Sequence, residues 1–229
     1  MKVGFFDSGI GGTCILNAFR AICPGAETVY LADEENRPYG PKPPEEVARI
    51  AEANAEKLMA EGCAVVVVAC NTATAAAIDM LRAKYPDVPF VGVEPAIKPA
   101  ARLSRTGVVG VLATAGTLGG RLYREAKEKF AKNVKVVSAV ADEFVVEAER
   151  LGGRPVDSLE PEAALRLEKI VRARVGPMLD AGADVIVLGC THFPHLKPVI
   201  ERVCAGRAEV VDPSDAVARQ VKRIVEGME

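Results

Sequence analysis

Two cysteines follow the same kind of apolar run and precede the same kind of polar turn. Residues 65–74 read VVVVACNTAT, and residues 185–194 read VIVLGCTHFP. Cys70 and Cys190 therefore both come directly after a predicted buried strand. A thiol at such a place is either a small buried hydrophobe or a reactive group that ionises readily beside backbone amides. The matched pair favours reactivity, because two thiols that share one crevice can act as an acid and a base.

The other sulfur and imidazole groups give weaker signals. Cys14, Cys63 and Cys204 fit the packing interpretation. The only histidines are His192 and His195, and the sequence has no CxxC pair, so we expect no metal site. All six cysteines are expected to be free thiols, because the cytosol is reducing.

Further polar residues follow three of the predicted strands. The stretch DSGIGG (7–12) lacks the glycine spacing of a dinucleotide site and the lysine of a phosphate-binding loop. Asp7 either caps the next helix, or it contacts a substrate ammonium or assists a thiol. Asn71 and Thr72 can cap a helix or donate to a carboxylate, and Thr191 can do the same beside the second cysteine.

Eight short apolar runs are typical of buried parallel strands. They are residues 2–6, 28–32, 64–69, 89–93, 107–113, 134–140, 184–189 and 208–212. Most are separated by amphipathic stretches, and those at 44–62 and 160–183 have apolar residues at helical spacing. Strands that alternate with helices predict an α/β fold with mainly parallel sheets.

A weak internal repeat predicts two similar halves. VGFFDSG (3–9) resembles VGVLATAG (109–116), as the two cysteine segments resemble each other. We expect two flavodoxin-like α/β domains that face each other across an active-site crevice. Their expected bounds are residues 1–95 plus 210–229, and residues 96–209. The tail after residue 212 is expected to pack back on the first domain as a helix.

Composition restricts the partners. The chain has 229 residues, of which 49% are hydrophobic, enough for a substantial core. A net charge of −2 and a pI near 5.9 give no reason to expect nucleic acid as a partner. No apolar run approaches the ~20 residues of a membrane span, and the N-terminus lacks the features of a secretory signal. These features predict a cytoplasmic protein that contacts neither a membrane nor nucleic acid.

Five motifs together resemble the glutamate racemase family of the aspartate/glutamate racemase superfamily. They are DSGIGG (7–12), RPYGPK (37–42), ACNTATA (69–75), GVLATAGT (110–117) and GCTHFP (189–194). The resemblance covers nearly the whole chain in the right order. Relatives that act on other amino acids carry CTE-like residues in the last motif, so His192 favours the glutamate branch.

The resemblance implies a cofactor-independent racemisation of glutamate that supplies D-glutamate for peptidoglycan. One cysteine removes the α-proton as a thiolate, and the other supplies a proton to the opposite face. Cys70 would act on the D-enantiomer and Cys190 on the L-enantiomer, while Asp7 and His192 tune the two thiols. Glu149 is implied as an auxiliary acid, with Glu147 as the alternative.

The resemblance also implies the remaining contacts of an amino-acid substrate. The ammonium and α-carboxylate would be held by Ser8, Asn71, Thr72, Thr114 and Thr191. The Tyr39–Gly40 backbone would receive the distal carboxylate. The implied enzyme needs no cofactor or metal and forms a homodimer.

Two stretches depart from the family pattern. DEENRPYG (33–40) replaces a DTARxPYG-like stretch, and ADEFVVEAE (141–149) replaces a CPxFVPLVE-like one. Aspartate or another amino acid or dicarboxylate therefore stays open as the substrate. A single-thiol hydrolase or decarboxylase and a two-lobed binding protein are further alternatives, but neither needs a matched pair of thiols.

Overall fold

The computed structural model describes residues 1–228, and its internal contacts divide them into two compact units. The first unit comprises Met1–Glu94 and the segment from Pro213 onward, and the second comprises Pro95–Asp212. The sequence-based expectation assigned residues 210–212 to the first domain. They belong to the second unit, because β8 (Glu209–Val211) pairs with a strand of that unit.

The first unit is built on a parallel sheet with the strand order β2-β1-β3-β4. Its strands are β1 (Lys2–Asp7), β2 (Glu27–Ala32), β3 (Val65–Val68) and β4 (Phe90–Gly92). Its helices are α1 (Thr13–Ile22), α2 (Pro44–Ala60), α3 (Asn71–Lys84) and α10 (Ser214–Glu226). Every strand lies within one or two residues of a predicted apolar run, so the predicted strands of this unit are confirmed.

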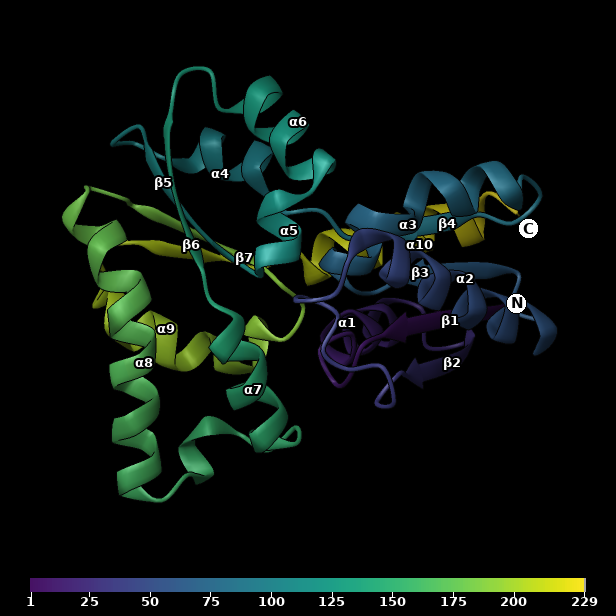
Figure 1. Ribbon diagram of the computed structural model, residues 1–229, viewed down its shortest axis with the longest axis horizontal. Coiled ribbons are helices and arrows are strands. Elements are labelled where there is room, and N and C mark those ends of the chain that lie inside the picture. The colour runs from purple at the N-terminus through teal and green to yellow at the C-terminus, as the bar shows by residue number, and fades with distance from the viewer. Residues whose placement is uncertain (229) are drawn as a thin grey trace. The chain divides into compact units, whose positions relative to one another are not determined.

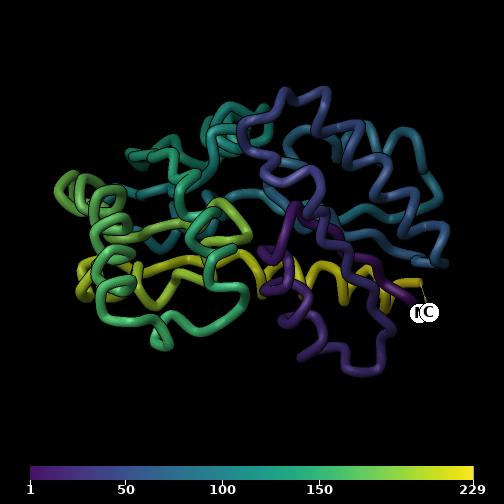
Figure 2. The backbone as a smooth tube through the Cα atoms, turned by 60° about the horizontal axis from the view of Figure 1, so that its bottom comes forward, coloured from purple at the N-terminus to yellow at the C-terminus, as the bar shows by residue number. Residues whose placement is uncertain are grey.

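Helices cover both faces of this sheet (Figure 1). Alternate strand residues, such as Phe5 and Val67, pack against Phe19 of α1 and Val221 of α10. The opposite face packs against α2 and α3. The final helix α10 thus returns to the unit that holds the N-terminal strand, as expected (Figure 2).

The second unit repeats this topology with the strand order β6-β5-β7-β8, again entirely parallel. Its other strands are β5 (Val108–Ala113), β6 (Lys135–Val140) and β7 (Val185–Gly189). Its helices are α4 (Ile97–Leu103), α5 (Ala115–Gly119), α6 (Arg121–Phe130), α7 (Asp142–Leu151), α8 (Pro161–Asp180) and α9 (Lys197–Cys204). Two 3-10 helices, η1 (Val156–Ser158) and η2 (Phe193–Leu196), complete it.

The strands of the second unit divide their side chains between two cores. Val111 and Val187 point to the core under α4 and α6. Leu112 and Leu188 point to the core under α7, α8 and α9, where Phe144 and Phe193 make an edge contact with ring centroids 5.2 Å apart. Alternation with a period of two is what a sheet covered on both faces requires. Figure 1 shows these two helical layers on either side of β5–β7.

The internal repeat is confirmed by the topology of the two sheets. β3 and β7 occupy the same third position, and β1 and β5 the same second position. The helix that leads into each third strand ends in the same way, at Gly62 and at Gly182, where φ is +81° and +91°. In each case the next residue donates its N–H to a carbonyl five residues earlier, on Leu58 or Met178. Glycine adopts this left-handed conformation without steric cost. Cys70 and Cys190 therefore follow equivalent strands.

None of the six cysteines, all of which lie within residues 1–228, forms a disulfide in the structure. Within residues 1–228, none of the helices combines the length and the apolar character that crossing a membrane requires.

Gly189 ends β7 where strands approach closely, so Gly189→Ala is expected to destabilise the fold by about 1–3 kcal/mol. An added Cβ would lie 2.8 Å from the carbonyl oxygen of Leu112 and 3.0 Å from the Cβ of Ala113. Gly119→Ala is the matched control, because its Cβ would meet no atom within 4 Å. Urea unfolding of both variants checks this. If Gly189→Ala and Gly119→Ala had equal free energies of unfolding, β5 and β7 would be able to move apart beside Cys190 without cost.

Candidate active site

The carboxyl ends of the strands in the first unit align the polar residues that follow them. Asp7 pairs with Ala32 across β1 and β2, and Phe6 pairs with Val68 across β1 and β3. The residues just past this edge include Ser8, Asp33 and Cys70. This edge is where open parallel α/β sheets bind ligands.

Cys70 is buried, with 6% of its surface exposed, and is the N-cap residue of α3. Its backbone is extended, with φ −140° and ψ 124°, and its carbonyl accepts the Thr74 N–H at 2.8 Å. Thr74 also fixes this corner through its hydroxyl, which donates to Val68 O and accepts from Val93 N. The amide groups and dipole of this helix start favour a negative charge on the sulfur.

Asn71, next to this cysteine, has one side-chain atom that lacks a hydrogen-bond partner within residues 1–228. Its Nδ2 donates to the carbonyl oxygen of Val93 at 3.2 Å. Its Oδ1 is buried and accepts no hydrogen bond from residues 1–228. Because a buried acceptor without a donor costs about 1–3 kcal/mol, this atom suits a donor on a ligand. Thr72, the following residue, is also buried.

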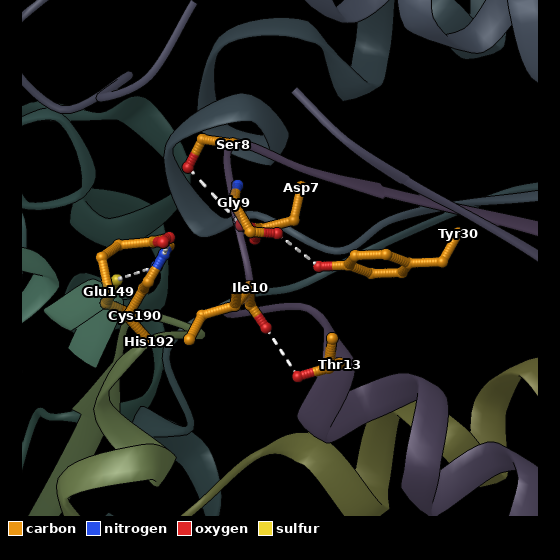
Figure 3. A network of polar contacts seen from close by, with 9 residues as sticks. All are labelled: Asp7, Ser8, Gly9, Ile10, Thr13, Tyr30, Glu149, Cys190 and His192. Atoms are coloured by element: carbon orange, nitrogen blue, oxygen red, sulfur yellow. Dashed lines mark hydrogen bonds and ion pairs between the residues drawn. The ribbon is translucent and has the colours of Figure 1, made fainter. Parts of the chain in front are cut away.

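Asp7 and Ser8 lie at the end of β1, as predicted (Figure 3). The Asp7 carboxylate is fully buried and accepts the Gly9 N–H at 2.9 Å and the Ser8 hydroxyl at 3.5 Å through Oδ1. Tyr30 donates its hydroxyl to Gly9 O at 2.7 Å. The following helix starts at Thr13 without a side-chain cap, so Asp7 is not its N-cap residue.

Tyr39 and Gly40 belong to the segment 33–40, which follows β2 in the first unit. Tyr39 is buried, and burial, followed by the Asp33 carboxylate, raises the pKa of its hydroxyl. The charges of Cys70 and Asp7 also contribute to this pKa shift, so Tyr39 lies within their electrostatic reach. Lys42 N donates to Tyr39 O at 3.1 Å and closes a turn.

In the second unit, the equivalent strand edge carries Thr114 and Cys190. The register pairs Ala113 with Gly189, so the two residues follow adjacent strands at the same level. Thr114 is the N-cap of α5: its hydroxyl oxygen accepts from Thr117 N at 3.3 Å and lies 3.0 Å from the Thr117 hydroxyl. Thr191 is buried beside the cysteine.

Cys190 forms a chain of contacts with His192 and Glu149 (Figure 3). Cys190 Sγ lies 3.9 Å from His192 Nδ1, and His192 Nε2 lies 2.7 Å from Glu149 Oε1. The imidazole is 2% exposed and the carboxylate 14%. With a proton on Nε2, the ring donates to Glu149, and Nδ1 can accept the proton of the thiol.

The two glutamates that the sequence could not distinguish have different partners. Glu147, on the same helix as Glu149, accepts hydrogen bonds from Arg150 at 2.7 Å and from both terminal nitrogens of Arg166, at 2.9 and 2.8 Å. Of these two glutamates, Glu149 is the one that forms a hydrogen bond with His192. The helix α7 thus directs one carboxylate to α8 and the other to the imidazole.

The two thiols therefore have different surroundings at equivalent positions. Cys70 caps a 14-residue α-helix, whereas Cys190 precedes a turn and the short 3-10 helix η2. Cys70 lies at the start of an α-helix, and Cys190 lies beside an imidazole that forms a hydrogen bond with a carboxylate. Each arrangement can stabilise a thiolate, the first through the helix start and the second through a protonated imidazole.

Sequence reasoning missed a hydrogen-bond network in which Asp33 accepts from the Tyr39 hydroxyl, from the buried Asn54 and from the half-buried Asn36. The only signal was that Asp33 comes directly after a predicted strand, at the same edge as Asp7.

Comparisons with known proteins identify the family of this chain. Residues 13–221 match the family model described as Asp/Glu/Hydantoin racemase. A glutamate racemase of Roseiflexus sp. (strain RS-1) is 45% identical over 224 residues, which are 98% of this chain and 79% of that protein. One of Pseudomonas putida (strain W619) is 40% identical over 229 residues, covering 99% and 82%.

Solved structures of two glutamate racemases resemble this chain. The Escherichia coli glutamate racemase in complex with L-glutamate and the activator UDP-MurNAc-Ala superposes with a TM-score of 0.85 at 34% identity, covering 98% of this chain and 82% of that one. The Thermus thermophilus glutamate racemase in complex with beta-chloro-D-alanine gives 0.74 at 33% identity, covering 99% and 81%. This chain, which repeats one sheet topology in two units and carries a thiol at the equivalent place in each, is thus a racemase and belongs to the Asp/Glu/hydantoin racemase family.

Proposed function

We propose that this racemase interconverts L- and D-glutamate without a cofactor, using Cys70 and Cys190 as a pair of acid–base groups. The observation that carries the proposal is the presence of a buried thiol after the equivalent strand of each unit. Inversion at an α-carbon needs a base on one face and an acid on the other. Two thiols supply both functions when one is ionised and the other protonated.

In the direction from L to D, the Cys190 thiolate removes the α-proton. The electron pair of the broken C–H bond stays on the α-carbon, which becomes a carbanion. The thiol of Cys70 then donates its proton to the opposite face and becomes the thiolate. In the reverse direction the roles exchange. His192 takes up the thiol proton of Cys190 when the thiolate forms, and Glu149 stabilises the resulting imidazolium. Asp7 is the corresponding auxiliary group on the side of Cys70.

The polar groups near the two thiols suit an amino acid that carries two carboxylates. Asn71 Oδ1, which accepts no hydrogen bond within residues 1–228, suits a substrate ammonium. The α-carboxylate is held by donors, which are the hydroxyl groups of Ser8, Thr72, Thr114 and Thr191. For the distal carboxylate, the N–H groups of Tyr39 and Gly40 are available, because neither donates to an acceptor within residues 1–228.

The same proposal includes the cellular role. The enzyme supplies D-glutamate for peptidoglycan, works in the cytoplasm as a homodimer, and requires neither metal nor cofactor. The support is the similarity to proteins named glutamate racemase, one of which was solved with L-glutamate bound.

Incubation with L- or D-glutamate in deuterated water, without added cofactor, tests the reaction. We expect α-deuterium incorporation and loss of optical rotation from either enantiomer. Exchange with aspartate but not with glutamate would reject the substrate and retain the mechanism. Activity that appears only after a metal or an organic cofactor is added would reject the mechanism.

A further inference from the structure

Asp33 is a buried carboxylate to which the proposed reaction assigns no role. It follows β2 and has 6% of its surface exposed. Its Oδ2 accepts the Tyr39 hydroxyl at 2.6 Å and Asn54 Nδ2 at 2.9 Å. Asn36 Nδ2 lies 2.9 and 3.0 Å from its two oxygens. Three side chains thus donate to one carboxylate, an arrangement that needs a pure acceptor.

This carboxylate is ionised at neutral pH. Burial alone would raise the pKa of Asp33, but the hydrogen bonds from Tyr39, Asn54 and Asn36 outweigh burial and hold it below its ordinary value. The pKa of Tyr39 is raised, so its hydroxyl keeps its proton and remains a donor. Hydrogen bonds to an ionised acceptor are stronger than those between neutral groups.

The network connects three parts of the first unit. Asp33 N donates to Asp7 O at 2.9 Å, which attaches the segment to the end of β1. Asn54 comes from the middle of α2 and also donates to the Tyr39 hydroxyl at 3.1 Å. By contrast Glu34 and Glu35, in the same segment, are exposed. Of the three acidic residues in DEENRPYG, only Asp33 is thus built into the core.

We propose that Asp33 is a positioning residue that sets where the Tyr39–Gly40 turn presents its N–H groups, and so selects a substrate with a distal carboxylate. This inference rests on the proposed function. Tyr39 is 1% exposed, and its hydroxyl forms hydrogen bonds with Asp33 and Asn54 that fix the far end of the side chain. A shift of the ring moves its own backbone, and therefore the N–H groups that meet the distal carboxylate.

Asp33→Asn tests the proposal, because it keeps the shape but replaces an acceptor with an amide that must present a donor to Asn36, Asn54 or Tyr39. We expect KM for glutamate to rise at least tenfold while kcat changes less than threefold. Glu34→Gln is the matched control: it removes a charge from the adjacent exposed residue and should leave both constants unchanged. Tyr39→Phe removes a single hydroxyl, keeps the ring, and should raise KM in the same direction.

A merely structural role predicts a different result. In that case the active fraction and kcat would fall while KM stayed the same, and this outcome would overturn the proposal, as would unchanged KM in both variants. If Asp33→Asn does not fold, the KM of Tyr39→Phe decides alone. Wild-type enzyme that does not racemise glutamate would instead reject the proposed function, so the two failures are distinguishable.

Discussion

Cys70→Ser and Cys190→Ser are each expected to lower the rate of racemisation by about 100- to 10,000-fold, the range that a positioned acid or base contributes. Serine keeps the size and the polar character of the side chain. Its hydroxyl, however, ionises far less readily than a thiol and cannot act as the base. Both side chains are buried, so bulk water cannot easily replace them. Polarimetry with each enantiomer of glutamate measures the loss.

The two serine variants should retain different partial reactions. In Cys70→Ser, the thiolate of Cys190 can still remove the α-proton of L-glutamate, exchange that proton with the solvent, and return a deuteron to the same face. We therefore expect slow α-deuterium incorporation into L-glutamate with retained configuration, and the mirror result for Cys190→Ser with D-glutamate. Mass spectrometry combined with chiral chromatography separates exchange from inversion.

Cys23→Ser is the control for loss of a thiol as such. Cys23 is half-buried and ends α1 as its C-cap, away from the strand edge that carries Cys70. Full activity is expected. If either Cys70→Ser or Cys190→Ser racemised glutamate at a rate near that of the wild type, two-base chemistry would be wrong for this enzyme.

The strands were predictable because a parallel sheet that is covered on both faces buries nearly every side chain of a strand. Each strand therefore appears in the sequence as a continuous apolar run. The equivalence of Cys70 and Cys190 was predictable for the same reason, since both follow such runs. The environment of Cys190 was not. The sequence suggested a helix start after each thiol, yet η2 begins at Phe193 and is a 3-10 helix. The proline at the second position of η2 is a local feature, and the contact of His192 with α7 is a tertiary one. The spacing of apolar residues reports neither of them.

The sequence alone could not tell which of Glu147 and Glu149 faces the imidazole, because it does not show which elements lie on each side of the helix. Residues two positions apart on an α-helix differ by about 200° around its axis, so the carboxylates of Glu147 and Glu149 point to different elements. Asp33 was missed for a related reason. Three acidic residues occur in DEENRPYG, and only the packing of Tyr39 and Asn54 makes one of them buried.

Glu149→Gln is expected to lower kcat/KM for glutamate by about 10- to 100-fold, because a hydrogen bond to a charged group contributes about 1.5–3 kcal/mol. Glutamine can still accept from His192 Nε2, but it no longer stabilises the imidazolium that forms when Cys190 is ionised. Glu147→Gln is the matched control on the same helix. It should weaken the contacts with Arg150 and Arg166, and so lower the free energy of unfolding, without changing kcat/KM.

The isotope effects, rather than the rates, show which thiol Glu149 serves. The equilibrium constant of racemisation is one, so kcat/KM must fall equally in both directions and cannot identify the affected step. In Glu149→Gln the step at Cys190 becomes more nearly rate-limiting. The primary isotope effect with α-deuterated L-glutamate should therefore increase, because Cys190 breaks that bond. With α-deuterated D-glutamate it should decrease, because Cys70 breaks that bond and the slow step now follows. The opposite pattern would assign Cys190 to the D-enantiomer, and equal effects would mean that Glu149 does not act through Cys190.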